Sequence, residues 1–348
     1  MLQSCLIAVL ANDPVVAIAQ GSQIYLYLDE QDTCVDAASD RHSSQIRSMC
    51  FSPCARYLVS GGDDKLLAVS DSRTGAFVHD IRFDKKITCV AFCGSTILVA
   101  DRFGGVFRVE TGNGFADPVE VTGHVETISA MAVTDTYLIT GDIDTKIRVC
   151  RYPSTHVIES FCLGHKEAIT TMCALPSSRL VSGGTDGTIR LWDLVTGDEI
   201  GRCDIRRDDD DEPAAVVLDV AYWPSSNAVA VVASGCSVVY VLDALTMDVR
   251  EKVALDSPPF SVGVDGRGRL WVGTATNLVS VSGPDREARV HDTPSKLMAA
   301  RASEATCASY VFEEINRKKE LQGREDRRAA KRAKQDHPDG ESTTTNHE

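Results

Sequence analysis

The sequence predicts an all-β fold, a β-propeller of seven four-stranded blades. Three observations lead to this prediction: one motif recurs along the chain, each copy reads as two strands joined by a tight turn, and the repeating segments number seven. A repeat of about 40–45 residues with these features is typical of propeller blades. A closed all-β architecture can hold a chain of 348 residues as one unit.

The clearest copies of the motif align without a gap. They are Val59–Asp71 and Val181–Asp193, and Ile139–Cys150 falls in the same register. Val99–Val109 is a weaker copy. Each copy consists of an apolar strand, a Gly/Asp turn and an alternating strand, which is the pattern of a β-hairpin within a blade.

Counting outward from these copies gives seven blades within residues 1–298, the predicted propeller domain. They are Leu6–Leu28, His42–Asp80, Lys85–Gly114, Val121–Ser160, Leu163–Cys203, Ala214–Val249 and Leu255–Val290. The last two lack the Gly-His and Trp-Asp pairs of the better copies but keep strand character. Terminal repeats are expected to be atypical, so the count stands at seven.

Two Gly-His pairs precede copies of the motif. Gly123-His124 precedes Asp144 at nearly the interval that separates Gly164-His165 from Asp186. This spacing resembles the WD-repeat family, in which a loop His, a strand Ser or Thr, a turn Asp and a strand Trp share hydrogen bonds. Transferred residue by residue, the resemblance implies a structural tetrad of His165, Ser182, Asp186 and Trp192.

A Ser/His/Asp set could also indicate a hydrolase. Here the set recurs with the period of the blades, and no Gly-x-Ser-x-Gly turn accompanies it, so we interpret it as structural. Phe103 stands where the turn Asp of the third blade would fall, so a complete tetrad is not expected in that blade.

Charge and composition restrict the function further. The formal net charge of −14 argues against a nucleic-acid footprint over the whole surface. The twelve cysteines are scattered singly without a zinc-site pattern, and no Gly-x-Gly-x-x-Gly cradle is present. We therefore expect no cofactor and no metal. The acidic run Arg206–Pro213 is expected to be a solvated loop.

Three segments resemble the WD-repeat, non-catalytic subunits of the eukaryotic tRNA (guanine-N7) methyltransferase. They are Asp84–Phe92 with Leu98–Asp101, Asp142–Val149, and Ile158–His165. The resemblance implies that this chain is not an enzyme. It implies a heterodimer in which the chain stabilises a Rossmann-like, S-adenosylmethionine-dependent methyltransferase that modifies N7 of a guanosine in the tRNA variable loop.

The same resemblance directs attention to charged residues near the matching segments. Lys146 and Arg148 alternate along one strand and therefore share a side, and with Glu159 they could form a mixed-charge patch for a partner. Lys85 and Lys86 are a second candidate pair. Ordinary solvated strand charges remain the alternative for all five residues.

A basic tail follows Ser303. Residues 317–334 hold nine basic and three acidic side chains, and the spacing of apolar residues permits a helix over 303–335, with disorder from 336 to 348. The tail is interpreted as a nuclear-import signal, a tRNA-binding segment, or both, and the nucleus as the expected location. The candidate tRNA-binding residues are Arg317, Lys318, Lys319, Arg324, Arg327, Arg328, Lys331 and Arg332.

A different binding function is the main alternative. A WD-repeat scaffold or substrate receptor in a ubiquitin ligase or in ribosome assembly would also use a propeller and a basic tail.

Overall fold

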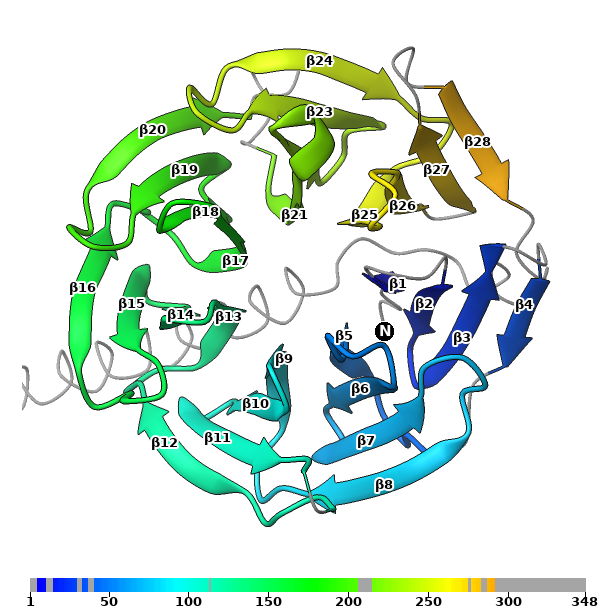
Figure 1. Cartoon of the computed structure of the whole chain (residues 1–348). Helices are drawn as coiled ribbons and strands as arrows, with labels where there is room; N and C mark the ends of the chain where they lie inside the picture. The colour runs from blue at the N-terminus through cyan, green and yellow to red at the C-terminus, as the bar shows by residue number, and fades with distance from the viewer. Residues whose placement is uncertain are drawn as a thin grey trace, which may run out of the picture.

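The chain folds into a ring of seven blades (Figure 1). The structure, a computed structural model, describes residues 5–10, 15–29, 33–36, 41–112, 114–205, 215–274, 277–282 and 287–291. Within these residues every blade is a four-stranded antiparallel sheet whose strands follow chain order. The prediction of an all-β, seven-bladed propeller is confirmed.

The strands of blades 1 to 4 are as follows. Blade 1 contains β1 (Cys5–Val9), β2 (Val15–Gln20), β3 (Gln23–Leu28) and β4 (Thr33–Asp36); blade 2 contains β5 (Ile46–Phe51), β6 (Tyr57–Gly62), β7 (Leu66–Asp71) and β8 (Phe77–Arg82). Blade 3 contains β9 (Ile87–Cys93), β10 (Thr96–Asp101), β11 (Gly105–Glu110) and β12 (Val119–Gly123); blade 4 contains β13 (Ile128–Val133), β14 (Tyr137–Asp142), β15 (Lys146–Arg151) and β16 (Ile158–Leu163).

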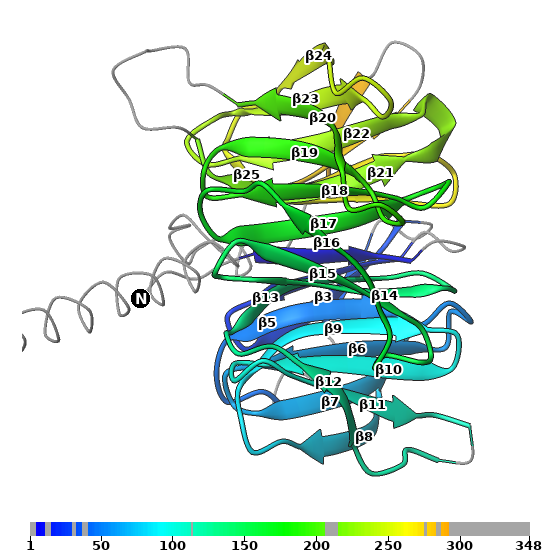
Figure 2. The same cartoon turned by 90° about the vertical axis from the view of Figure 1, so that its left-hand side faces the viewer.

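The strands of blades 5 to 7 continue in the same order. Blade 5 contains β17 (Ile169–Leu175), β18 (Arg179–Gly184), β19 (Thr188–Asp193) and β20 (Glu199–Asp204); blade 6 contains β21 (Val217–Trp223), β22 (Ala228–Ala233), β23 (Val238–Asp243) and β24 (Val249–Ala254). Blade 7 contains β25 (Pro259–Val264), β26 (Leu270–Thr274), β27 (Leu278–Ser282) and β28 (Glu287–His291). The first strand of each blade lies nearest the ring axis and the fourth lies on the outer wall, as β16 does in the edge-on view of Figure 2.

The blade boundaries differ from the predicted ones at the outer strands. Val121, predicted to open the fourth blade, lies in β12 of blade 3, and Leu163, predicted to open the fifth, ends β16 of blade 4. The outer strands β12 and β16 are exposed or half-buried over most of their length, so their apolar residues do not follow the alternation of buried and exposed positions that predicts a strand.

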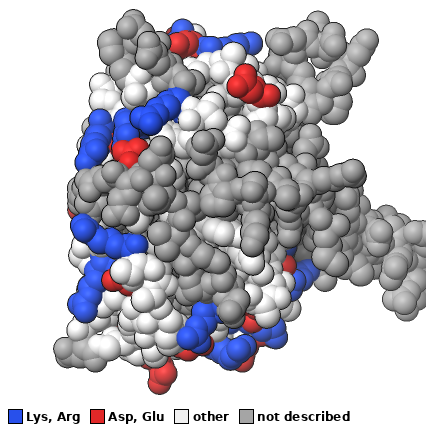
Figure 3. All heavy atoms as spheres, turned by 90° about the vertical axis from the view of Figure 1, so that its right-hand side faces the viewer, with Lys and Arg blue, Asp and Glu red and all other residues white. Residues whose placement is uncertain are grey.

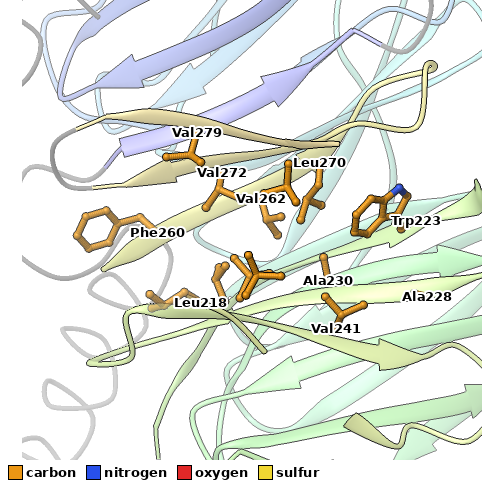
Figure 4. Packing of buried hydrophobic residues seen from close by; sticks show 14 of the residues in the cluster. Leu218, Trp223, Ala228, Ala230, Val241, Phe260, Val262, Leu270, Val272 and Val279 are labelled. Atoms are coloured by element: carbon orange, nitrogen blue, oxygen red, sulfur yellow. The ribbon is translucent and has the colours of Figure 1, made fainter. Parts of the chain in front are cut away.

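Blades 6 and 7, which lack the Gly-His and Trp-Asp pairs, pack through aliphatic side chains. Leu218 and Val241 of blade 6 face Val262 and Val272 of blade 7 (Figure 4), within one buried cluster. Burial of a Val or Leu side chain contributes about 1.5–3 kcal/mol to stability. Apolar packing therefore makes up much of the contact between these two blades.

The tetrad of blade 5 is a continuous chain of hydrogen bonds. His165 Nδ1 lies 3.2 Å from the Asp186 carboxylate, His165 Nε2 lies 2.7 Å from Ser182 Oγ, and Trp192 Nε1 donates to the same Oγ at 2.8 Å. Burial alone would raise the pKa of Asp186, but the hydrogen bond with His165 and backbone amide donors hold that pKa well below its usual value. The four side chains are thus satisfied inside the blade.

Blade 4 uses a different aspartate from the one that the sequence alignment indicates. His124 Nδ1 lies 3.1 Å from Asp142 Oδ2, and Asp144, the aligned residue, is exposed. In blade 5 the position of Asp142 is Gly184, where a Cβ would stand 2.8 Å from His165 Nδ1. The absence of a side chain at Gly184 leaves that space to Asp186, whereas in blade 4 Asp142 fills it.

The ring closes between blades 7 and 1 without a shared strand. The amide of Ile7 donates to Ser261 Oγ at 3.3 Å, and Tyr27 Oη lies 2.7 Å from His291 Nδ1. Arg269 donates to Asp29 at 2.8 Å across the same junction. Side-chain contacts between the two sheets therefore close the circle.

One buried carboxylate connects three consecutive blades next to this junction. Asp219 of β21 accepts from Thr171 Oγ1 of blade 5 at 3.2 Å, and from Ser261 Oγ and the Val262 amide of blade 7 at 2.7 and 3.0 Å. Burial raises the pKa of Asp219, against the opposing effect of these donors. Ser261 relays this network to Ile7 of blade 1.

Replacing Asp142 with alanine should destabilise the propeller more than replacing Asp144. Asp142→Ala leaves the nearly buried side chain of His124 and the two turn amides of Asp144 and Lys146 without their acceptor, which should lower the free energy of unfolding by about 1–3 kcal/mol. Asp144→Ala changes an exposed side chain and should shift the free energy of unfolding by less than about 0.5 kcal/mol. Chemical denaturation of both variants measures the difference; equal losses would contradict the assignment of Asp142.

Ser261→Ala should weaken the closure of the ring. The variant removes one donor to Asp219 and the acceptor of the Ile7 amide, so we expect a loss of about 1–3 kcal/mol in the free energy of unfolding. Ser225→Ala, at an exposed serine of blade 6, is the matched control. Hydrogen exchange should show faster exchange in β1 and β25 of the Ser261 variant, and unchanged exchange there would refute the role of Ser261.

Candidate protein-docking site

One end of the ring carries both the turns between second and third strands and the connections between blades. In blade 3, Asp101 at the end of β10 pairs with Ile87 at the start of β9, and Gly105 at the start of β11 pairs with Gly123 at the end of β12. The same antiparallel order applies to every blade. We call this end of the ring the connector end.

Lys146 lies at the connector end of blade 4. It is the first residue of β15, pairs with Leu163 of β16, and is exposed. Its amide donates to Asp142 at 3.0 Å, which fixes the backbone, while its ammonium forms no ion pair with any described residue. Lys146 therefore presents an uncompensated charge from a rigid position.

Arg148 is two residues along the same strand and on the same side, as predicted, but it is partly buried. Its Nη2 donates to the carbonyl oxygen of Gly123 at 2.8 Å and to Thr122 Oγ1 at 3.1 Å, both in β12 of blade 3. Its Nε is buried and has no hydrogen-bond partner among the described residues. Arg148 is thus a link between two blades as well as a surface charge.

Arg190 is the equivalent arginine of blade 5, and its charge is paired with a carboxylate. Its Nε donates to Thr188 Oγ1 at 3.0 Å and its Nη1 to Glu199 at 2.5 Å. Arg148 has no carboxylate within ion-pair distance in the described part of the chain. An incoming carboxylate would supply for Arg148 what Glu199 supplies for Arg190.

Glu159 lies at the other end of the strand pair. It forms an ion pair with Arg151, the last residue of β15, because β15 and β16 run antiparallel and the register shifts between Val149 and Cys150. The structure therefore does not bring Glu159 together with Lys146 and Arg148, and the expected mixed-charge patch does not form from these three.

Lys85 and Lys86 lie in the connection between blades 2 and 3 and have different surroundings. Lys86 Nζ lies 3.1 Å from Asp63, a carboxylate that also accepts from Arg47. Lys85 Nζ stands 4.7 Å from the ring centroid of Phe103, an attractive cation–π arrangement. Lys86 is thus engaged within the protein, whereas Lys85 remains available at the connector end.

Sequence reasoning missed the apolar part of this surface. Phe103 and Val125 are largely exposed, whereas the sequence pattern identifies Phe103 only as an irregular tetrad position. Asp101 accepts from the amides of Phe103 and Gly105 at 2.8 and 2.9 Å, so it performs the turn-capping role and leaves the Phe103 side chain free to face solvent. A phenylalanine at the tip of a polar turn is the signal that could have identified it.

The predicted tRNA-binding residues, Arg317 to Arg332, and the acidic run 206–213 lie outside the described residues. On the side of the ring that carries β28 and β4, the described basic and acidic side chains are interspersed (Figure 3). Within the described ranges, no helix is long and apolar enough to cross a membrane, and no cluster of His, Cys, Asp and Glu could hold a metal ion.

Comparison with known families gives two matches. The profile described as the tRNA methyltransferase TRM82 WD40 domain matches residues 116–300, which is more than half of the chain. The profile of the anaphase-promoting complex subunit 4 WD40 domain matches residues 6–95, within the first three blades.

Among curated proteins, the chain is similar to subunits named as tRNA (guanine-N(7)-)-methyltransferase non-catalytic subunits. It is 29% identical to wdr4 of Xenopus laevis, over 68% of this chain and 64% of that protein, and 29% identical to WDR4 of Homo sapiens, over 68% and 61%. It is 32% identical to wuho of Drosophila ananassae over 44% of this chain and 40% of that protein. The chain thus spans less than two thirds of the length of these relatives.

Similar solved structures show the fold alone. The structure of U3-55K has a TM-score of 0.69 at 19% identity, covering 79% of this chain and 89% of that chain. The RRP9 WD40 repeats have a TM-score of 0.69 at 19% identity, covering 79% and 88%. Since its family profile spans the larger part of the sequence, this chain belongs to the TRM82 WD40 domain family of tRNA methyltransferase proteins.

Proposed function

We propose that this chain is the non-catalytic subunit that binds and stabilises an S-adenosylmethionine-dependent tRNA (guanine-N7) methyltransferase, for formation of N7-methylguanosine in the tRNA variable loop. Membership of the family and the names of the relatives support this role. The partner in this proposal is the catalytic subunit, in a heterodimer, and tRNA is bound mainly through the complex.

The uncompensated charges of Lys146 and Arg148 carry the proposal in this structure. Lys146 is exposed and fixed through its backbone, and Arg148 lacks the carboxylate that its counterpart Arg190 has. Charges held in place before binding favour a partner that presents carboxylates, because less conformational entropy is lost on association. The partner should therefore place acidic side chains against the connector end of blade 4.

The Ser/His/Asp sets of the propeller do not supply a hydrolytic site. Ser182 is fully buried, and its Oγ is occupied by both His165 and Trp192. A nucleophilic serine must reach a substrate carbonyl, which this hydroxyl cannot do inside a packed blade. Serine, histidine and aspartate here stabilise a blade, which is consistent with a supporting role for the chain in a complex.

The basic tail extends the proposal to tRNA and to location. Its cations at residues 317–332 would contact phosphates of a tRNA held by the complex, and the same composition would serve nuclear import. The nucleus is accordingly the proposed site of action.

Lys146→Glu should weaken binding to the catalytic subunit at least tenfold without lowering the melting temperature of the propeller. The reversal removes an attraction and places a carboxylate opposite the carboxylates expected on the partner. Calorimetric titration of the two purified subunits gives the dissociation constant, with Lys252→Glu on blade 6 as the matched exposed-lysine control. Methylation of tRNA should fall with the complex and recover when excess partner is added.

Normal binding by the Lys146 variant would exclude the connector end of blade 4 as the docking site. Recovery of ubiquitin-ligase or pre-ribosome components from cells, without a methyltransferase, would favour the alternative scaffold role instead.

Deletion of residues 317–348 should leave the heterodimer intact and weaken tRNA binding in a salt-dependent way. Each lost phosphate contact should flatten the slope of log K against log salt by about 0.9 for double-stranded regions. Filter binding of the complex to a tRNA transcript between low and moderate salt measures this slope. An unchanged slope would leave nuclear import as the role of the tail.

A further inference from the structure

The three most exposed large apolar side chains of the described chain share one location. Val125 is 98% exposed, Phe103 67% and Leu163 64%, whereas every other exposed large apolar residue in the described ranges is 50% exposed or less. Exposed apolar side chains that are scattered singly over the surface are normal in soluble proteins. These three are not scattered, because all lie at the connector end of the adjacent blades 3 and 4.

The loops that carry Phe103 and Val125 support each other through their backbones. The His124 amide donates to the Gly104 carbonyl at 2.8 Å, and Thr127 Oγ1 donates to the Arg102 carbonyl at 2.7 Å. Gly104 has a φ of +86°, and a Cβ there would collide with the carbonyl oxygen of His124. The two loops are therefore in contact at a distance that only glycine permits.

His124 fixes the base of the Val125 loop from inside the blade. Its Nδ1 lies 3.1 Å from Asp142 and its Nε2 lies 2.6 Å from Thr140 Oγ1. Arg148 holds the preceding residue, Gly123, from the other side. Val125 is thus presented to solvent by a loop that is already ordered, so a partner would bind it with little loss of conformational entropy.

Lysines without ion-pair partners lie next to two of the three apolar residues. Lys85 lies over the ring of Phe103, and Lys146 is the register partner of Leu163. Neither lysine forms an ion pair with a described residue. The surface therefore combines exposed apolar side chains with adjacent lysines, as protein-docking sites combine buried anchors with charged edges.

We propose that Val125, Phe103 and Leu163 are the apolar anchors through which this chain binds the catalytic methyltransferase subunit. This inference rests on the function proposed above and identifies the kind of surface that the partner presents: an apolar patch rimmed by carboxylates that meet Lys85, Lys146 and Arg148. In such interfaces a few buried anchors provide most of the affinity, and rim charges provide orientation and speed of association.

The chemistry of this surface favours a partner protein over a nucleic acid or a second copy of this chain. Two of the three anchors, Val125 and Leu163, are aliphatic and offer no aromatic plane for stacking on a base, which fits a protein-docking site better than a nucleic-acid stacking platform. A second copy of this chain would bring its own lysines against Lys85 and Lys146 in a two-fold contact, which like-charge repulsion disfavours.

The test uses the full chain and its catalytic subunit with three single variants, Val125→Ser, Phe103→Ser and Leu163→Ser. Each should weaken the heterodimer at least tenfold and leave the melting temperature unchanged, because the side chains are exposed in the free protein. The loss should persist in high salt, whereas the loss caused by Lys146→Glu should shrink as salt screens the charges. Ile200→Ser and Leu245→Ser, half-exposed aliphatic residues at the opposite end of blades 5 and 6, are the matched controls.

The outcomes separate this inference from the proposed function. Normal binding by all three serine variants, with weakened binding by Lys146→Glu, would overturn the apolar anchors and leave the function in place. Failure of the unmodified chain to bind the methyltransferase would overturn both. Two further results would also overturn the anchors: variants that alter only self-association in sedimentation of the chain alone, and variants that alter only its binding to a tRNA transcript.

Discussion

Closure of the ring is the constraint on which every other feature depends, since each blade needs a neighbour on both faces. No strand is shared between blades 7 and 1, so the closing contact consists of side chains. Asp219 and Ser261 carry a hydrogen-bond network from blade 5 to blade 1, and Tyr27 meets His291 nearer the outer wall. A gap here would expose the apolar faces of two blades at once.

The same polar residues that stabilise the blades also shape the proposed docking surface. His124 satisfies Asp142 and Thr140 within blade 4, and its backbone fixes the loop that carries Val125. Arg148 ties that loop to the next blade while keeping a positive charge near solvent. Stability and recognition are therefore coupled at this point, and a change in either residue would affect both.

The sequence predicted what depends on local spacing and missed what depends on neighbouring blades. The seven blades and the residues of the blade 5 tetrad could be identified because their signals repeat at a fixed interval. The use of Asp142 could not, because blade 4 carries an aspartate where blades 2 and 5 have Gly62 and Gly184, and the aligned Asp64 and Asp186 pair with histidine there. The separation of Glu159 from Lys146 follows from the antiparallel pairing of β15 with β16, and the exposure of Val125 from contacts between loops, neither of which leaves a periodic pattern.

Closure through side chains also has a consequence for the order in which the molecule is assembled. Every blade is continuous in the chain, so its own contacts form between near neighbours as soon as it leaves the ribosome. The contacts of the seam instead join residues 254 and 264 positions apart, Ile7 with Ser261 and Tyr27 with His291. During synthesis the first blade must therefore keep one apolar face uncovered until the seventh emerges, and for that interval the growing chain depends on chaperones or on speed to avoid aggregation.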